Sequence, residues 1–184
     1  VATGPFQTPL FPNERQYISN GVIQLHSSEY RNPTQLQDGN VIIIGGGNSG
    51  AQIAVELSKQ REAYLSISKP LKFFPLTLGS NRSIFWAFDI LGVLKVPAES
   101  LIGKRIQRAG DPVFGYDLKE AIKDNKVKIV SRYQKGEGNT LSFKNGEKVE
   151  VNNIIWATGF KPNYGWLNID GILNERGFLQ HNRG

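Results

Sequence analysis

The chain has 184 residues, of which 39% are hydrophobic, and a formal net charge of +6. It has no apolar run of about 18 residues and no basic start followed by an apolar core, so we predict neither a membrane span nor a signal peptide and expect a cytoplasmic protein. The absence of cysteine excludes disulfides, thiolate metal sites and a cysteine nucleophile, and no metal site is predicted. The positive charge is spread along the chain, which suits a polyphosphate ligand better than a nucleic acid.

The first forty residues predict a crossing segment and one short strand. Residues 1–12 contain three prolines, which favour extended or turn geometry over helix. Residues 22–26 form a plausible strand, and residues 31–40 form a loop. His26 is a lone histidine, which we expect to be a hydrogen-bonded structural residue. Because the sequence has no methionine even at position 1, we expect this opening to belong to the interior of a longer chain.

A glycine-rich segment dominates the rest of the sequence. Residues 41–44 are four apolar residues, the pattern of a strand buried on both faces, and residues 45–50 fit G-x-G-x-x-G ahead of an amphipathic run. The first glycine permits a tight turn, the second lets a pyrophosphate approach the backbone, and the third lets the helix pack against the strand. The alternative is a glycine-rich turn in an ordinary α/β domain. With the helix start facing the phosphates, a dinucleotide is predicted to bind Gly45, Gly46, Gly47, Asn48, Ser49 and Gly50.

The end of the next strand indicates which dinucleotide binds. Residues 63–68 alternate like a second parallel strand and complete a βαβ unit. A carboxylate at its end would accept from the ribose 2′-hydroxyl of NAD, whereas a cation or hydroxyl would accommodate the 2′-phosphate of NADP. The strand ends in Ser68 and Lys69, so we predict NADP(H). Arg82 is a second candidate phosphate partner, and an ordinary exposed loop lysine is the alternative for Lys69.

Three helices are predicted beyond this unit, over residues 81–94, 100–108 and 116–124. The first is rich in aromatic residues, which we expect to pack in a core or at a domain interface. A substrate-facing role is the alternative for Trp86.

The last third of the chain predicts strands. Residues 126–133 form one strand, and residues 140–143 and 148–151 flank Asn145-Gly146, the dipeptide of a two-residue hairpin turn. Residues 153–157 return as a buried strand. The predicted fold class is therefore α/β: a Rossmann-like parallel sheet with an inserted antiparallel β-meander.

Four motifs together resemble a known family. Residues 2–5 (Ala-Thr-Gly-Pro), residues 26–30 (His-Ser-Ser-Glu-Tyr), the glycine motif and residues 156–162 (Trp-Ala-Thr-Gly-Phe-Lys-Pro) occur in this order. The sequence is similar to the NADPH domain of bacterial flavin-containing monooxygenase-like proteins, in particular to flavoproteins associated with cation diffusion facilitators. It departs from the family pattern at Gly21, which lies one residue too far from His26, and at Ser68, where the family has an arginine.

This resemblance implies an NADPH domain inserted into an FAD domain. Residues 1–30 would be a crossing segment and a stub of the FAD domain, residues 31–160 the NAD(P)H-binding domain, and residues 161–184 the return segment. The FAD pyrophosphate motif is missing from the chain, which we therefore expect to be inactive alone. The two Ala-Thr-Gly segments would mark the crossings, and the second adds three cofactor-binding residues: Ala157, Thr158 and Gly159.

The implied activity is that of a flavin monooxygenase in the full-length protein. NADPH would reduce FAD, and the reduced flavin would use oxygen to oxygenate a soft nitrogen or sulfur nucleophile or a carbonyl. The implied partners are NADPH, the FAD domain of the same chain and a small-molecule substrate. The residues of this chain would position cofactors, and no catalytic residue is assigned.

Three other classes of protein share part of this pattern. A thioredoxin-reductase-like flavoprotein shares the domain order, but its redox cysteine pair normally lies in the NADPH domain, and this chain has no cysteine. A short-chain dehydrogenase needs Tyr-x-x-x-Lys, whereas Tyr116 and Lys119 are only three positions apart. A non-catalytic nucleotide-binding module stays open.

Overall fold

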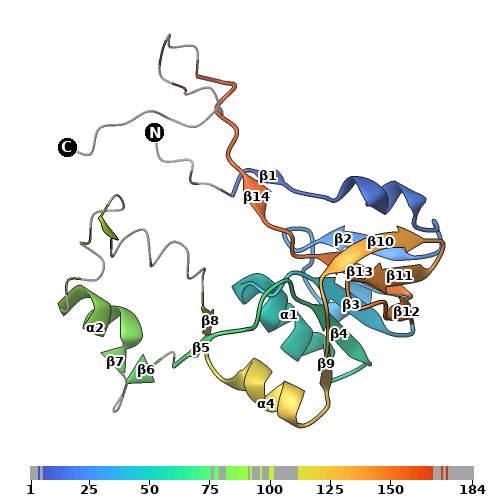
Figure 1. Ribbon diagram of the computed structural model, residues 1–184, viewed down its shortest axis with the longest axis horizontal. Helices are drawn as coiled ribbons and strands as arrows, with labels where there is room; N and C mark the ends of the chain where they lie inside the picture. Colours follow the sequence, from blue (N-terminus) through green and yellow to red (C-terminus); the bar gives the residue numbers. More distant parts are fainter. Residues whose placement is uncertain are drawn as a thin grey trace.

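The apolar run at residues 41–44 forms the middle strand of a five-stranded parallel sheet (Figure 1). The computed structural model describes residues 4, 6–75, 77–78, 82–90, 92, 96, 100–101, 112–167, 171 and 173. All neighbouring strands of the sheet run parallel, in the order β2-β13-β3-β4-β9. In chain order these strands are β2 (Ile23–His26), β3 (Val41–Ile44), β4 (Ala63–Ser66), β9 (Val127–Val130) and β13 (Asn153–Trp156).

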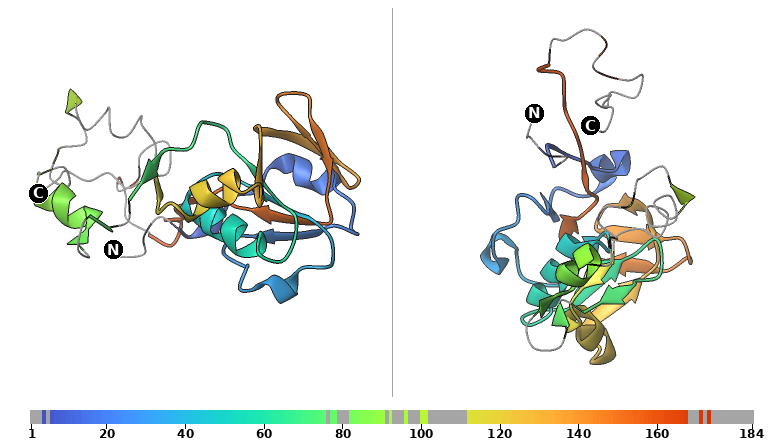
Figure 2. Two further views of the ribbon diagram at one scale, coloured as in Figure 1. Left: turned by 90° about the horizontal axis from the view of Figure 1, so that it is seen from below. Right: turned by 90° about the vertical axis from the view of Figure 1, so that its left-hand side faces the viewer.

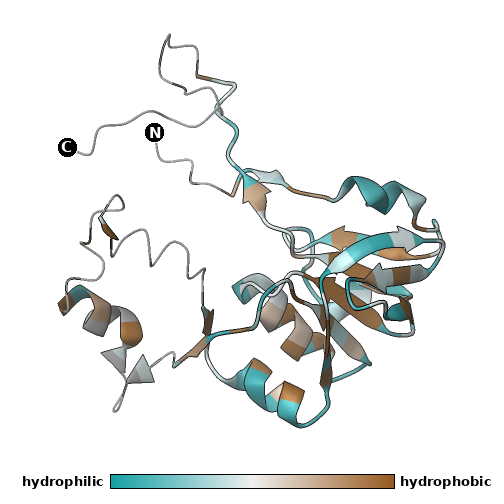
Figure 3. Ribbon diagram, viewed as in Figure 1, coloured by the Kyte–Doolittle hydropathy of each residue, from teal (hydrophilic) through white to brown (hydrophobic). Residues whose placement is uncertain are grey.

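The two faces of the sheet carry different layers, and Figure 2 gives two further views of them. Side chains alternate along β3, so that Val41 and Ile43 pack on one face and Ile42 and Ile44 on the other. The first face is covered by helices α1 (Asn48–Leu57) and α4 (Asp117–Lys123). Figure 3 shows the hydrophobic colouring concentrated on the strands between these layers.

The second face is covered by the predicted meander, formed by β10 (Tyr133–Glu137), β11 (Thr140–Phe143) and β12 (Lys148–Glu150). Leu141 and Phe143 are fully buried there against Trp156 of β13. A 3₁₀ helix, η1 (Asn13–Tyr17), packs beside β10, where Ile18 bridges to Gly138. Helices on one face and strands on the other confirm the predicted α/β class with an inserted meander.

The hairpin between β11 and β12 differs from the prediction of a two-residue turn. The Phe143 N–H donates to the Glu147 carbonyl at 3.0 Å, which leaves a three-residue loop. Gly146 takes φ 84°, whereas Asn145 lies outside the left-handed region that a type I′ turn would require. The side-chain oxygen of Asn145 accepts the Glu147 N–H at 3.2 Å, which favours a turn with a glycine bulge instead.

Between β4 and α4 the chain forms short elements, and those of residues 77–78 and 82–90 stand apart from the sheet in Figure 1. Strand β5 (Phe73–Phe74) pairs with β8 (Val113–Phe114), and β6 (Thr77–Leu78) pairs with β7 (Arg82–Ser83). Helix α2 (Ile84–Ile90) is shorter than the predicted helix 81–94, because residues 82–83 are taken up by β7.

The other two predicted helices have different outcomes. The helix predicted over residues 100–108 lies outside the described residues, apart from residues 100 and 101, while the helix at 116–124 is confirmed as α4. In α2, Trp86 has an exposed fraction of 48%, so it is not a core residue of the described part of the chain.

A two-stranded ribbon leaves the sheet where β13 ends. Strand β1 (Thr8–Pro9) pairs antiparallel with β14 (Phe160–Lys161), and the Leu10 N–H donates to the Gly159 carbonyl at 3.0 Å. The segments that precede β2 and follow β13 therefore run side by side. A short 3₁₀ helix, η2 (Pro33–Gln35), interrupts the predicted loop ahead of β3.

An amide network closes the opposite end of the sheet, where the strands begin. The side chain of Asn153 is fully buried and donates to the carbonyls of Gln37 and Asn40 at 3.0 and 2.9 Å. Its oxygen accepts the Gln37 N–H at 3.0 Å. One side chain thus satisfies three backbone groups and holds the loop before β3 against β13.

We predict that Asn153→Ala lowers the free energy of unfolding by about 2–4 kcal/mol, because three partly buried polar groups lose their partner. Urea denaturation followed by circular dichroism measures the change. The matched control is Asn139→Ala, an exposed asparagine whose side chain, among the described residues, accepts only from Thr140. Equal losses for both variants would contradict the special role of Asn153.

Candidate functional site

A cleft of about 660 Å³ opens at the carboxyl ends of β3, β4, β9 and β13. After β3 the chain continues to β4 on one side, while β13 lies on the other, so the cleft lies where the strand order reverses. Ligands of open parallel sheets bind at this kind of position. The cleft is lined by Pro12, Glu14, Ile44, Gly45, Gly46, Gly47, Ser66, Ser68, Arg132, Tyr133, Gln134, Ala157, Thr158 and Gly159.

Two glycines of the motif are required by the packing of the turn itself. Gly45 takes φ +123°, and a Cβ there would lie 2.2 Å from the Ala157 carbonyl oxygen. A Cβ on Gly50 would lie 2.0 Å from the Gly45 carbonyl oxygen. Since atoms cannot approach so closely, these glycines let α1, the turn after β3 and the end of β13 come together.

Gly47 is different, because nothing in the described structure requires it to be glycine. Its φ of −75° is open to any residue, and no atom lies within 4 Å of the position of a Cβ. Gly47 is the N-cap residue of α1, with no side-chain cap and no acidic residue in the first turn. The first N–H groups of an α-helix have no acceptor within the helix, and the space beside Gly47 is open, as an anion site at a helix start needs.

The structure brings seven of the predicted site residues to the cleft: Gly45, Gly46, Gly47, Ser68, Ala157, Thr158 and Gly159. Asn48 instead has a structural contact, since its side chain donates to the Pro112 carbonyl at 3.0 Å and accepts the Phe114 N–H at 2.9 Å. Ser49 and Gly50 lie in the first turn of α1 but not in the cleft lining.

The remaining predicted cations are not placed in the cleft. Lys69 is exposed and is not part of the lining. The side chain of Arg82 lies outside the described residues, as do Ala2 and Thr3 of the first Ala-Thr-Gly segment. Binding of a nucleotide by any of these residues stays a prediction.

Sequence reasoning missed Glu14, Arg132, Tyr133 and Gln134. The predicted strand 126–133 included Arg132 and Tyr133, whereas β9 ends at Val130, and residues that follow a parallel strand meet at the ligand edge of the sheet. The position of Arg132 at the end of the predicted strand could therefore have identified it as a site residue. Glu14 reaches the cleft from η1, far away in the sequence, and no local pattern indicates this position.

Ser66 fixes the segment that carries Arg132. The buried Ser66 hydroxyl donates to the Ser131 carbonyl at 2.8 Å and accepts the Tyr133 N–H at 3.1 Å. The backbone is therefore held on both sides of Arg132 by the end of the neighbouring strand β4.

Tyr133 places a protonated hydroxyl on the same side of the cleft as Arg132. The oxygen is buried without a hydrogen-bond partner among the described residues. Burial, and to a smaller extent the Glu14 carboxylate, raises the pKa of Tyr133 to about 12. The ring packs edge-on against Trp156, with 5.5 Å between the ring centroids.

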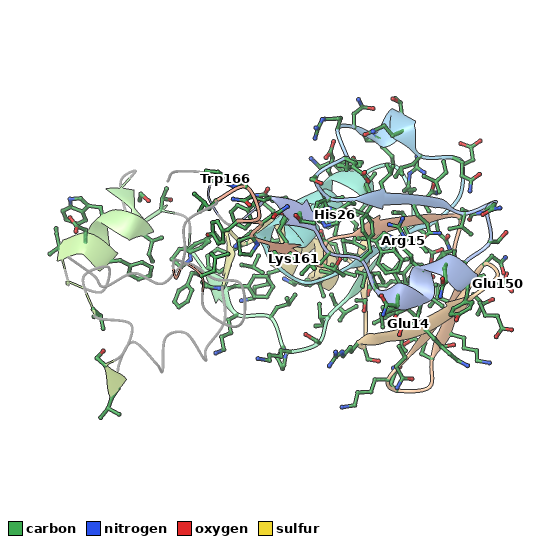
Figure 4. All side chains as sticks on the ribbon, turned by 90° about the horizontal axis from the view of Figure 1, so that it is seen from above. Glu14, Arg15, His26, Glu150, Lys161 and Trp166 are labelled. Atoms are coloured by element: carbon green, nitrogen blue, oxygen red, sulfur yellow. The ribbon has the colours of Figure 1, made fainter. Side chains whose placement is uncertain are left out.

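His26 connects β2 to the segment that leaves β13 and is fully buried (Figure 4). Its Nδ1 accepts the Ser28 N–H at 3.2 Å, so the neutral ring carries its proton on Nε2 and donates to the Gly159 carbonyl at 3.1 Å. Phe11 and Phe160 pack edge-on against the ring. Burial lowers the pKa of His26 below 6.5 and outweighs the opposite effects of the Gly159 hydrogen bond and of Glu29.

We predict that the histidine makes folding sensitive to mild acid. Below pH 6.5 the unfolded chain binds a proton at His26 that the folded chain excludes, so the free energy of unfolding falls as the pH drops from 6.5 toward the folded pKa. Above 6.5 this contribution is complete. Thermal unfolding between about pH 5 and 8 should show a steeper loss for the unmodified chain than for His26→Gln. Parallel pH profiles would contradict this role of His26.

Comparisons with known proteins point to one family. The sequence model of the pyridine nucleotide-disulphide oxidoreductase family matches residues 1–70. The uncharacterized oxidoreductase CzcO of Bacillus subtilis (strain 168) is 52% identical over 184 residues, which are 100% of this chain and 53% of the relative.

Two solved structures share the fold. A flavin-containing monooxygenase from Stenotrophomonas maltophilia matches with a TM-score of 0.68 and 23% identity, over 98% of this chain and 48% of that chain. The cyclohexanone monooxygenase from Rhodococcus sp. Phi1, crystallised with NADP⁺, matches with a TM-score of 0.59 and 14% identity, over 86% and 45%.

The chain is thus similar over its whole length to CzcO-type oxidoreductases and shares the fold of flavin-containing monooxygenases. The chain spans about half the length of the curated relatives it matches. The name of the matching family refers to disulphide chemistry, but this chain contains no cysteine that could supply a thiol. No helix in the described part of the chain has the length and hydropathy that crossing a bilayer requires.

Proposed function

We propose that this chain is the NADP(H)-binding domain of an FAD-dependent oxidoreductase. The observation that carries the proposal is Gly47, a glycine that neither φ nor packing requires, at the uncapped start of α1 and in the lining of the cleft. A glycine in such a place is explained by a ligand that must approach the backbone, and the start of a helix favours an anionic one.

The cleft offers different groups to the different parts of a dinucleotide. The N–H groups at the start of α1 would bind the pyrophosphate, after which the adenosine half would extend toward Ser68, beyond β4. The nicotinamide half would extend the other way, toward Ala157, Thr158 and Gly159. A bound NADPH supplies a hydride, and the residues of this chain would hold and orient it.

The nicotinamide end of the cleft adjoins the β1–β14 ribbon. The Thr158 hydroxyl donates to the Leu10 carbonyl, and the Gly159 carbonyl accepts from both Leu10 and His26. The segments that flank the ribbon expose large apolar side chains, with exposed fractions of 77% at Phe6 and 57% at Trp166. We propose that an FAD domain of the same protein covers this ribbon, which would make residues 1–30 and 161–184 crossing segments around the binding domain 31–160.

The proposed activity of the whole protein is oxygenation of a soft nitrogen or sulfur nucleophile, or of a carbonyl, at the expense of NADPH. The Stenotrophomonas maltophilia and Rhodococcus proteins of the same fold, whose names are those of monooxygenases, support this choice. A reductase without redox cysteines and a non-catalytic nucleotide-binding module are the alternatives. In either case the cleft would bind the same dinucleotide.

The first test is isothermal titration calorimetry of the chain with NADPH and NADH. We predict tighter binding of NADPH and at least a tenfold loss of NADPH affinity in Gly47→Ala, because the added methyl group would stand where the pyrophosphate approaches. The same variant should change the free energy of unfolding by less than about 1 kcal/mol, since its Cβ meets no other atom.

The matched control is Gly21→Ala, another open glycine without a left-handed φ, which lies outside the cleft lining. It should leave NADPH binding unchanged. Absent or equal binding of the two nucleotides, or undiminished NADPH binding by Gly47→Ala, would contradict the proposal.

A second test separates the monooxygenase from its alternatives in the full-length protein loaded with FAD. We predict that a suitable amine, sulfide or ketone raises NADPH consumption and that removal of oxygen abolishes this increase. An oxygen electrode and the absorbance of NADPH measure the two reactants. Substrate-dependent NADPH oxidation that persists without oxygen would favour a reductase, and no oxidation at all would favour a binding module.

A further inference from the structure

We propose that Arg132 is the residue that selects NADP(H) over NAD(H), by pairing its guanidinium with the 2′-phosphate beside the Ser68 hydroxyl. The inference rests on the proposed function, because it assigns a specificity residue to the same cleft. It moves the cationic partner of the phosphate from the end of β4, where the sequence favours Lys69, to the end of the adjacent strand β9.

The charge distribution of the cleft is the first argument. Of the described residues that line it, only Arg132 and Glu14 are charged. A 2′-phosphate is anionic, and Arg132 is the one cation of this lining that could neutralise it, whereas Lys69 lies outside the lining. A guanidinium also presents several N–H donors in the planar arrangement that binds phosphate oxygens in pairs.

The position of Arg132 along the sheet edge is the second argument. Strand β9 pairs with β4, and β4 pairs with β3, so residues after β9 lie two strand spacings, about 10 Å, from the glycine turn after β3. The pyrophosphate would occupy the turn itself. Ser68 follows β4, between the glycine turn and Arg132, where the adenosine ribose would lie. Arg132 therefore faces the 2′-position better than the pyrophosphate.

The rigidity of the segment is the third argument. The Ser66 hydroxyl bonds to the backbone on both sides of Arg132, and the Arg132 carbonyl accepts the Lys144 N–H at 2.9 Å from the meander hairpin. The Ser131 hydroxyl donates to the side-chain oxygen of Asn145 at 2.9 Å and accepts its N–H at 3.1 Å. The backbone is thus fixed by both layers, while the arginine side chain stays exposed and has no ion pair with the described residues. Preorganised groups of this kind lose little entropy when they bind a ligand.

The test uses two fragments that differ only in the phosphate, 2′,5′-ADP and 5′-AMP, titrated calorimetrically into the chain. We expect 2′,5′-ADP to bind at least tenfold more tightly. Arg132→Gln should reduce this preference by about tenfold or more and leave the affinity for 5′-AMP within about twofold, because a hydrogen bond to a charged group is lost. The fold should be unaffected, and the thermal unfolding curve checks this.

Two further variants make the outcome specific. Lys135→Gln removes the same charge three residues away, from an exposed side chain outside the cleft lining, and should leave the preference intact. Lys69→Gln tests the residue that the sequence favours. The inference is overturned if Lys69→Gln removes the preference for 2′,5′-ADP while Arg132→Gln keeps it. It is also overturned if Arg132→Gln weakens the binding of both fragments equally, because the arginine would then stack on the adenine that both fragments share.

The same titrations separate this inference from the function on which it rests. If the unmodified chain binds both fragments and Arg132→Gln keeps the preference, only the role of Arg132 fails. If the unmodified chain binds neither fragment nor NADPH, the proposed function fails and the inference fails with it.

Discussion

The structure depends on one close approach, between the turn that follows β3 and the end of β13. The two strands are paired, and the carbonyl oxygen of Ala157 occupies the space that a Cβ on Gly45 would need. The Gly45 carbonyl in turn occupies the space of a Cβ on Gly50, so α1 is pressed against the same turn. Because strand end, turn and helix start are packed without side chains between them, the N–H groups at the start of α1 come to the edge of the sheet. The cleft is a consequence of this backbone packing.

The two ends of the sheet have different physical roles. Where the strands begin, the buried Asn153 and the Asn152–Asn40 pair of reciprocal hydrogen bonds satisfy the backbone of the loops and close the edge. Where the strands end, Gly47 and the start of α1 leave backbone donors facing open space. Side-chain hydrogen bonds thus satisfy the loop backbone at one end, while the other end can expose polar backbone groups to a ligand.

The sequence predicts what local patterns determine. The strand at residues 41–44, the glycine turn and α1 follow from periodicity and from glycine spacing, and each lies where it was predicted. The hairpin type was wrong, because the side chain of Asn145 bonds to Glu147 and to Ser131, a contact that the dipeptide alone does not reveal. Glu14 could not have been placed, since it reaches the cleft only through the packing of η1 on β10. The cleft residues missed by sequence reasoning thus depend on tertiary contacts or on the exact end of a strand.

The meander illustrates how such contacts connect the two layers. Its buried side chains cover one face of the sheet, and Phe143 packs there against Trp156. Its hairpin also bonds to the Ser131 hydroxyl and to the Arg132 carbonyl, so the element that completes the core fixes the outer rim of the cleft. A change of hairpin length would therefore move the segment after β9 even though the glycine turn stayed in place. The proposed pyrophosphate and 2′-phosphate sites are thus held by different layers of the fold, so a substitution in one layer can alter one site and leave the other unchanged.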